Sequence, residues 1–301
     1  MIKGLAITPP VIGRISIGRV VEKNGQRLPQ KDDQFTLTTQ VQQRGEWVLH
    51  PLNETLRKAV PGKLRSIPVR LLFNAPDLNL RAEYCLFDRE TGRPICVGNG
   101  ERCKRVEPDG IAILPCPSPQ GCQFGGPGGC KPYGRLNVTV GDEDEMGSFI
   151  FRTTSFNSIR TLAARLHYFS AVSGNLLSCL ALELKLRGKS TTQSYRSAIY
   201  YVDLDVRSGK TLEATITEAR EVDARRKASG FDQAGLDAAA QLGFSNGAFE
   251  DSPEEVASVM EEFYPESSGN DPSEMAPPAA SAPTLREKLD RKAALLGGTA
   301  A

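Results

Sequence analysis

Four cysteines in one short, proline- and glycine-rich stretch are the residues of this sequence best suited to chemistry. Twelve, five and seven residues separate them, and they are Cys103, Cys116, Cys122 and Cys130. Four thiolates complete a tetrahedral zinc site and leave no position for water, so such a zinc is structural rather than catalytic. Apart from Ile111 to Leu114 the stretch has few apolar side chains. Metal binding contributes about 10 kcal/mol to ordering such segments, and we expect it here.

The thiol chemistry has alternatives that the spacing leaves open. The chain has seven cysteines, and Cys96 is a fifth candidate ligand, so either Cys96 or Cys103 completes the site. Cys85 and Cys179 stand in apolar patterns and are expected to be buried as small hydrophobic residues. Free thiols and disulfides remain alternatives, although clustered cysteines in a reducing compartment favour a metal.

Basic residues form two groups that suit contact with an anionic partner. One group brackets the cysteines and the other lies in a polar loop; together they are Lys104, Arg105, Lys131, Tyr133, Arg135, Arg187, Lys189 and Arg196. Cations beside hydroxyls and an aromatic ring suit phosphate contacts and base stacking, but also an acidic protein or plain solvent. The 37 basic and 36 acidic residues nearly cancel, which excludes a basic field over the whole surface.

Motifs for catalysis are absent or incomplete. The segments Gly188-Lys-Ser and Gly209-Lys-Thr lack the earlier glycine of a phosphate-binding loop, because Glu183 and Leu204 stand there. The two histidines, His50 and His167, have no partner that the sequence identifies. The acidic run 142–145 lacks the ligand rhythm of a calcium loop and is interpreted as a solvated turn.

Hydrophobic periodicity predicts an α+β fold with a mixed or antiparallel sheet. The strongest helix is amphipathic and spans 156–173, with an N-cap at Thr154 or Ser155 and an end at Gly174-Asn175. Strands are predicted at 2–8, 14–21, 34–42, 67–74, 83–88, 94–98, 134–140, 148–154, 176–186 and 198–206. Strands and helices without regular alternation favour α+β over a doubly wound sheet.

The composition divides the chain into three parts. Residues 1–207 form the α+β domain that contains the cysteine-rich loop 103–130, and 208–264 form a helical extension. In that extension, Ser252-Pro-Glu-Glu255 has the pattern of a helix start. Residues 265–301 read as a disordered linker and a short terminal helix. No segment has the length of a membrane span or the form of a signal peptide, so a cytoplasmic, reduced protein is expected.

Three segments carry a resemblance to a known family. They are LPCPSPQGC at 114–122, GCKPYGRL at 129–136 and GSFIFRTTS at 147–155, followed by Ile159-Arg160. Over roughly residues 1–207 the chain resembles the recombination directionality factors of phages and integrative elements, some of whose relatives are labelled hydrolase or metal-binding protein. The resemblance implies a non-enzymatic accessory protein that acts with a serine integrase on DNA. It matches Cys116, Cys122 and Cys130 to the family's cysteine motif, and Cys103 less securely.

The sequence therefore favours a zinc-binding protein of a mobile element that controls site-specific DNA recombination. One alternative is a metal-dependent hydrolase, in which carboxylates from Asp142 to Glu145 join a thiolate-bound metal. Another is a single-stranded DNA-binding or annealing protein. The sequence leaves open the identity of the integrase, the oligomeric state, direct contact with DNA and the role of the tail.

Overall fold

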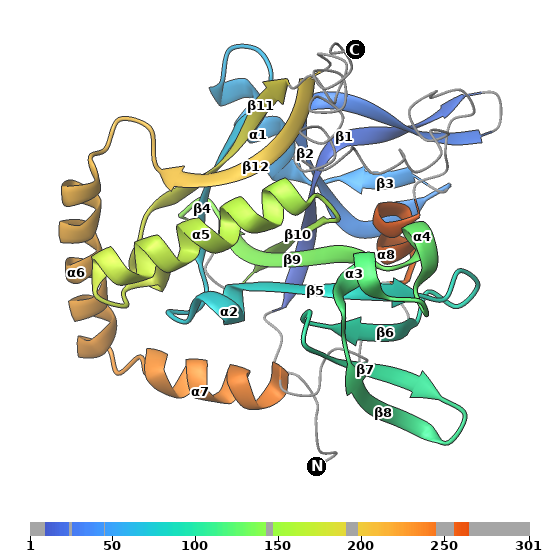
Figure 1. Ribbon diagram of the computed structural model, residues 1–301. Coiled ribbons are helices and arrows are strands. Elements are labelled where there is room, and N and C mark those ends of the chain that lie inside the picture. Colours follow the sequence, from blue (N-terminus) through green and yellow to red (C-terminus); the bar gives the residue numbers. More distant parts are fainter. Residues whose placement is uncertain are drawn as a thin grey trace, which may run out of the picture. The chain divides into compact units, whose positions relative to one another are not determined.

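One mixed β-sheet runs through the part of the chain that the computed structural model describes (Figure 1). The described residues are 10–23, 26–44, 46–142, 147–190, 198–244 and 256–264. Contacts group Met1–Glu266 in one unit, and the second unit, Ser267–Ala301, lies outside the described residues. The predicted strand at 2–8, the linker and the terminal helix also lie outside them.

The main path of the sheet has the strand order β3-β2-β1-β10-β9-β5-β6-β7-β8. Its strands are β1 (Val11–Lys23), β2 (Gln26–Gln43), β3 (Glu46–Leu49), β5 (Leu80–Phe87), β6 (Pro94–Gly98), β7 (Arg102–Glu107), β8 (Gly110–Pro115), β9 (Lys131–Val140) and β10 (Ser148–Thr153). A branch leaves the far end of β9 through β4 (Ser66–Leu71), β11 (Leu182–Ser190) and β12 (Ala198–Val206). β1 pairs with β10 in parallel, and the other described ladders are antiparallel.

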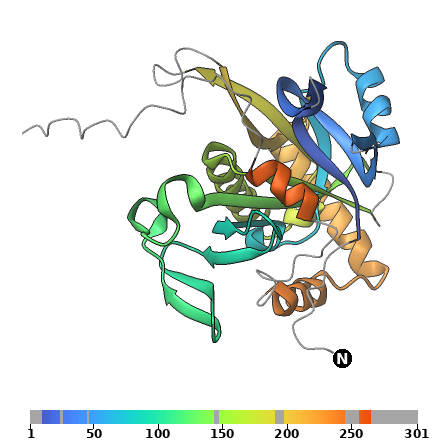
Figure 2. The same ribbon diagram turned by 90° about the vertical axis from the view of Figure 1, so that its right-hand side faces the viewer.

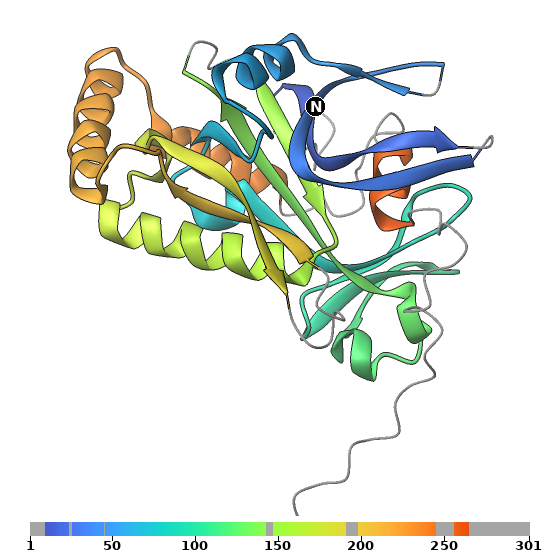
Figure 3. The same ribbon diagram turned by 90° about the horizontal axis from the view of Figure 1, so that it is seen from above.

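Helices pack on both faces of this sheet (Figures 1 and 3). The longer ones are α1 (Pro51–Ala59), α5 (Phe156–Ser173), α6 (Leu212–Ala228), α7 (Gln233–Phe244) and α8 (Val256–Phe263). Short turns of helix are α2 (Pro76–Asn79), α3 (Ser118–Gly121), α4 (Gly126–Gly129) and the 3₁₀ turn η1 (Leu177–Cys179). None of the described helices has the length and apolarity needed to cross a membrane.

The main hydrophobic core lies between α5, α6 and the inner half of the sheet. The buried α5 side chains Leu162, Leu166 and Phe169 pack in one cluster with aliphatic and aromatic residues of β4, β9, β10, β11 and β12. Ser155 caps the start of α5 by accepting a hydrogen bond from the Ser158 N–H (3.4 Å), and Gly174 ends it with φ 70°. The α+β prediction and the predicted helix at 156–173 are therefore confirmed.

Two predictions of local structure were wrong. Residues 176–186 do not form one strand, because η1 turns the chain at Leu177–Cys179 before β11 begins at Leu182. The region after Cys103 is not a loop that depends on metal for all of its order, since β7 and β8 form a hairpin on the sheet edge. Backbone hydrogen bonds between the two strands, and from β7 to β6, order that hairpin. The prediction failed because it considered only the apolar side chains of the stretch, and strand pairing does not depend on them.

Candidate functional site

The five clustered cysteines lie at the β6–β8 end of the sheet, which projects away from the core (Figure 2). We call residues 94–130 the cysteine module. Cys96 lies on β6 and Cys103 on β7, while Cys116 follows β8, Cys122 follows α3 and Cys130 follows α4. Pairing of β6 with β7 positions Cys96 and Cys103. The short helices α3 and α4 place Cys122 and Cys130 in the same region.

Glycine allows close approach of the thiols within the module. A Cβ atom at Gly98 would lie 2.7 Å from the Cβ of Cys103 and 2.8 Å from the sulfur of Cys116. Because real Cβ atoms are never this close to other heavy atoms, only glycine fits between the two cysteines. Gly98 therefore leaves room for two cysteines that twelve residues separate along the chain.

The five thiols of the module lie close enough to influence one another's pKa. Burial, followed by the neighbouring thiols of Cys96, Cys122, Cys116 and Cys103, raises the pKa of Cys130 to about 12. Burial also raises the pKa of Cys96 to about 11, against the effect of a hydrogen bond from Arg105. These two thiols are therefore protonated at neutral pH in the metal-free protein, and a metal ion would have to displace their protons.

The donor set suits a thiophilic metal, but the side chains do not stand in coordinating positions. Within the described residues, no three Cys, His, Asp or Glu side chains are placed together as a metal site. The seven cysteines are free thiols, with Cys96 and Cys103 buried and Cys116, Cys122 and Cys130 half-buried. The prediction that Cys103, Cys116, Cys122 and Cys130 bind zinc therefore stays a prediction.

The basic residues predicted for partner contact do not form one exposed patch. Lys131 donates a hydrogen bond to the Phe263 carbonyl (3.2 Å), and Tyr133 and Arg135 are buried beneath α8. Arg187 is ion-paired with Asp203 (2.6 Å) on another branch of the sheet. Of the others, Lys189 donates to Asn157 (2.8 Å), Arg105 stacks on Phe124 (3.9 Å), Lys104 is half-buried on β7, and Arg196 lies outside the described residues.

A row of arginines on the sheet face beneath α8 was missed by sequence reasoning. Arg152 on β10 pairs with Arg135 on β9, which pairs with Arg81 on β5, and directly paired residues point to the same face. Arg14 on β1 joins the row, because its partner Ile150 is two residues from Arg152. The signal was present in the alternation of β10, where Ser148, Ile150 and Arg152 share one face and Phe149 and Phe151 share the other.

Carboxylates from two sources face this arginine row. Glu83 of the sheet accepts from Arg135 (3.2 Å). Glu262 of α8 accepts a hydrogen bond from the Thr154 backbone N–H (3.1 Å) and lies close enough to Arg14 and Arg152 to interact with both charges. Although part of the residue remains exposed, burial of its carboxyl group raises the pKa of Glu262 to about 7. Arg14 also stacks on Trp47 (3.9 Å).

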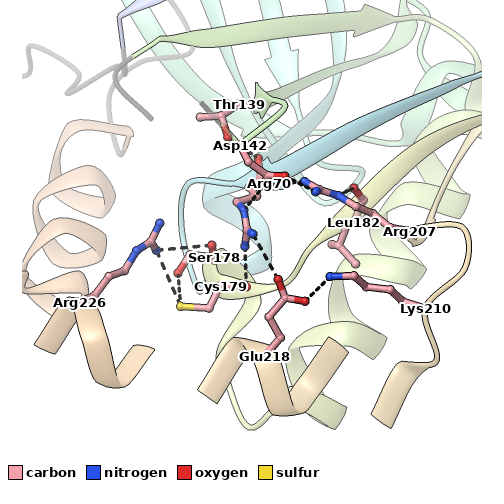
Figure 4. A network of polar contacts seen from close by, with 10 residues as sticks. All are labelled: Arg70, Thr139, Asp142, Ser178, Cys179, Leu182, Arg207, Lys210, Glu218 and Arg226. Atoms are coloured by element: carbon pink, nitrogen blue, oxygen red, sulfur yellow. Dashed lines mark hydrogen bonds and ion pairs between the residues drawn. The ribbon is translucent and has the colours of Figure 1, made fainter. Parts of the chain in front are cut away.

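The carboxylate proposed for a hydrolase is occupied by structural ion pairs (Figure 4). Asp142 accepts from Arg70 (2.8 Å) and from Arg207 (3.0 Å), and Glu218 of α6 joins Arg70 to Lys210. The Arg207 guanidinium, followed by that of Arg70, lowers the pKa of Asp142 to about 2. This network fastens α6 to β4 and to the end of β12, while residues 143–145 lie outside the described residues.

The two histidines have structural positions. His50 caps α1 by accepting from the Leu52 N–H (3.2 Å) and its ring contacts Phe149 edge-on. His167 lies on the exposed side of α5, 3.8 Å from Asp77, whose side chain is more exposed still. The described contacts of the two histidines, with Leu52, Phe149 and Asp77, include no nucleophile, so a histidine-based mechanism gains no support.

The sheet with its cysteine module and arginine row belongs to a known class of protein. The model of the Gp3-like family, described as recombination directionality factor-like, matches residues 12–207, which are 196 of the 301 residues. The chain therefore belongs to the recombination directionality factor-like family. The match begins in β1, ends just after β12 and leaves out α6, α7 and α8. No curated protein and no solved structure matched this chain.

Proposed function

We propose that this protein is a recombination directionality factor that acts with a serine integrase of a mobile element. Membership of the family over the whole described sheet carries the proposal. The positions of Asp142 and His50 support a protein without catalysis of its own, because each is used in a structural contact.

The proposed mechanism is a shift of population between two states of a nucleoprotein complex. A factor that binds the excision-competent integrase complex more tightly than the integration-competent one favours excision by that difference in affinity. Such a mechanism needs a binding surface and no reacting groups. A molecule with a packed core and a projecting module suits this function better than it suits hydrolysis or strand annealing.

Recombination with purified proteins tests this function. The integrase from the same mobile element is incubated with paired attachment sites, with and without the protein. We expect the protein to permit recombination between the two product sites and to inhibit recombination between the two original sites. No change in either reaction, with binding to the integrase also absent, would contradict the proposal.

We also propose that the cysteine module binds one structural zinc ion through Cys103, Cys116, Cys122 and Cys130. The mutual proximity of the thiols, the burial of Cys103 and the small number of apolar residues in this stretch of sequence support this. Cys96 competes for the fourth position, since its thiol interacts with Cys103 and is held by Arg105. When bound, zinc would crosslink β7 with the turns that follow β8, α3 and α4.

Elemental analysis of the reduced protein tests the zinc proposal. One zinc per chain is expected, lost on serine substitution of Cys103, Cys116, Cys122 or Cys130. Cys85→Ser is the matched control, because Cys85 is buried in a different cluster and should leave the metal content unchanged. Retention of zinc in the Cys103 variant and its loss in the Cys96 variant would reassign the fourth ligand. Absence of metal from the reduced wild-type protein would overturn the site.

A further inference from the structure

The groove under α8 has the composition of a protein-binding site. Cys85, Phe87, Val97 and Tyr133 form a small apolar cluster on the sheet, separate from the main core. Arg135 and Arg152 lie beside this cluster on the same face. Buried aromatic residues next to arginines are typical of the energetic centres of protein interfaces.

In the structure α8 packs on this apolar cluster as an intramolecular ligand. Val259 and Phe263, one helical turn apart, are buried in the apolar cluster, and the Phe263 ring lies 4.8 Å from that of Phe87. Tyr264 donates a hydrogen bond to the Phe87 carbonyl (2.7 Å). The helix therefore binds through an apolar pair four residues apart, followed by an aromatic residue.

Because of the arginine row, a helix that packs on this cluster needs hydrogen-bond acceptors or carboxylates beside its apolar residues. Like charges directly opposite each other on neighbouring strands repel, so Arg152 and Arg135 require acceptors nearby. The sheet supplies Glu83, and α8 supplies Glu262 between its two apolar anchors. A helix with a cation at the position of Glu262 would face Arg14 and Arg152 and be repelled.

The helix α8 has little stability of its own. The helix has eight residues, which is too short to be stable by itself in water, and it buries a carboxyl group with its two anchors. It also lies outside the family match, whereas each groove residue named above lies inside it. A short helix that depends on its docking contacts, and that packs in a cluster separate from the main core, can open locally without unfolding that core.

We infer that the groove formed by Phe87, Val97, Tyr133 and the arginine row is a docking site for an amphipathic helix of a partner protein, which α8 occupies in its absence. The partner helix carries two apolar side chains at positions i and i+4 and a carboxylate or amide at i+3. Exchange of α8 for that helix would couple partner binding to β6 and β9, the strands that carry Cys96 and lead out of Cys130.

A peptide that copies α8 tests the inference without integrase or DNA. The probe is a fluorescein-labelled peptide of residues 254–266, and its binding to the full chain is followed by fluorescence anisotropy. A full-length variant with Glu262→Arg and Phe263→Ala releases the groove, so it should bind the peptide at least about tenfold more tightly than the wild-type chain does. Glu221→Arg, an exposed charge reversal on α6, is the matched control and should bind as the wild type does.

Peptide variants and a buried thiol separate specific docking from unfolding. A peptide with glutamine in place of Glu262 should still bind, and one with arginine there should not. Alkylation of Cys85, which is buried under α8, should rise in the double variant and fall again when peptide is added. Circular dichroism should show the same main melting transition in both chains.

Three results would overturn the inference. They are equal peptide binding to wild type and double variant, no peptide binding to a double variant that melts normally, and protection of Cys85 in that variant without peptide. A wild-type dimer that dissociates in the double variant would also overturn it, because α8 would then dock on a second copy of this chain.

Discussion

The two ends of the sheet are stabilised in different ways. At the β4–β11–β12 end, α5 and α6 cover an aliphatic core in which Leu162, Leu182 and Leu204 are fully buried. At the β6–β8 end, five thiols gather in the cysteine module, and Ile111 (58%) and Ile113 (64%) on the outer hairpin are largely exposed. The first end is therefore stabilised mainly by apolar burial. The second has less apolar burial and is ordered by strand pairing.

Removal of metal should give the largest difference between the two ends. With the proposed zinc bound, a strong chelator should lower the stability of the cysteine module by up to about 10 kcal/mol and leave α5 folded. Hydrogen exchange followed by mass spectrometry should show lost protection in 102–130 and unchanged protection in 156–173. Equal loss in both segments would show that the two ends unfold as one unit.

Truncation of a core side chain should affect the other end most strongly. Leu162→Ala removes a fully buried side chain from the main core, so it should lower the free energy of unfolding by about 3 kcal/mol. The matched control is Leu242→Ala on α7, where 77% of the side chain is exposed and a change within about 0.5 kcal/mol is expected. Urea denaturation measures both. A small effect at Leu162 would mean that the core can close the cavity.

The ion-pair network around Asp142 should contribute less. Asp142→Ala removes the acceptor shared by Arg70 and Arg207, and because this carboxylate is half-exposed the loss should be about 1 kcal/mol. Its pKa is lowered to about 2 in the folded protein, so its contribution is present above about pH 4 and is lost as the pH falls through about 2. Melting curves between pH 2 and pH 6 should therefore converge for wild type and variant at the acid end. A difference that persists at the lowest pH would contradict this assignment.

The smallest effect concerns α8. The pKa of Glu262 is raised to about 7 by burial, despite Arg14 and Arg152, so docking is strongest below about pH 4.5 and weakens as the pH rises through about 7. Glu262→Gln removes that ionisation and should make docking independent of pH over this range. The ratio of Cys85 alkylation in wild type to that in the variant should increase from pH 6 to pH 8. A constant ratio would show that Glu262 does not titrate there.

Local pattern was sufficient to identify most elements of the fold. The 3.6-residue spacing of Phe156 to Phe169 defines α5 because its capping residues and apolar face lie within one segment. The apolar alternation of 198–206 likewise matches β12. Prediction failed where neighbours decide the structure: η1 interrupts a continuous apolar run at Leu177, and the hairpin of β7 and β8 depends on pairing with β6.

For the candidate site, the sequence determined the chemistry of the residues but not their arrangement. It identified the cysteines, and only the tertiary structure brought Cys96 on β6 beside Cys103 and Cys130. It predicted Tyr133 and Arg135 as candidate partner-contact residues, and the structure buries both under α8. Spacing along the chain is a local property, whereas burial and charge proximity depend on which strands pair. Tertiary contacts also join residues more than a hundred positions apart, such as Thr154 and Glu262.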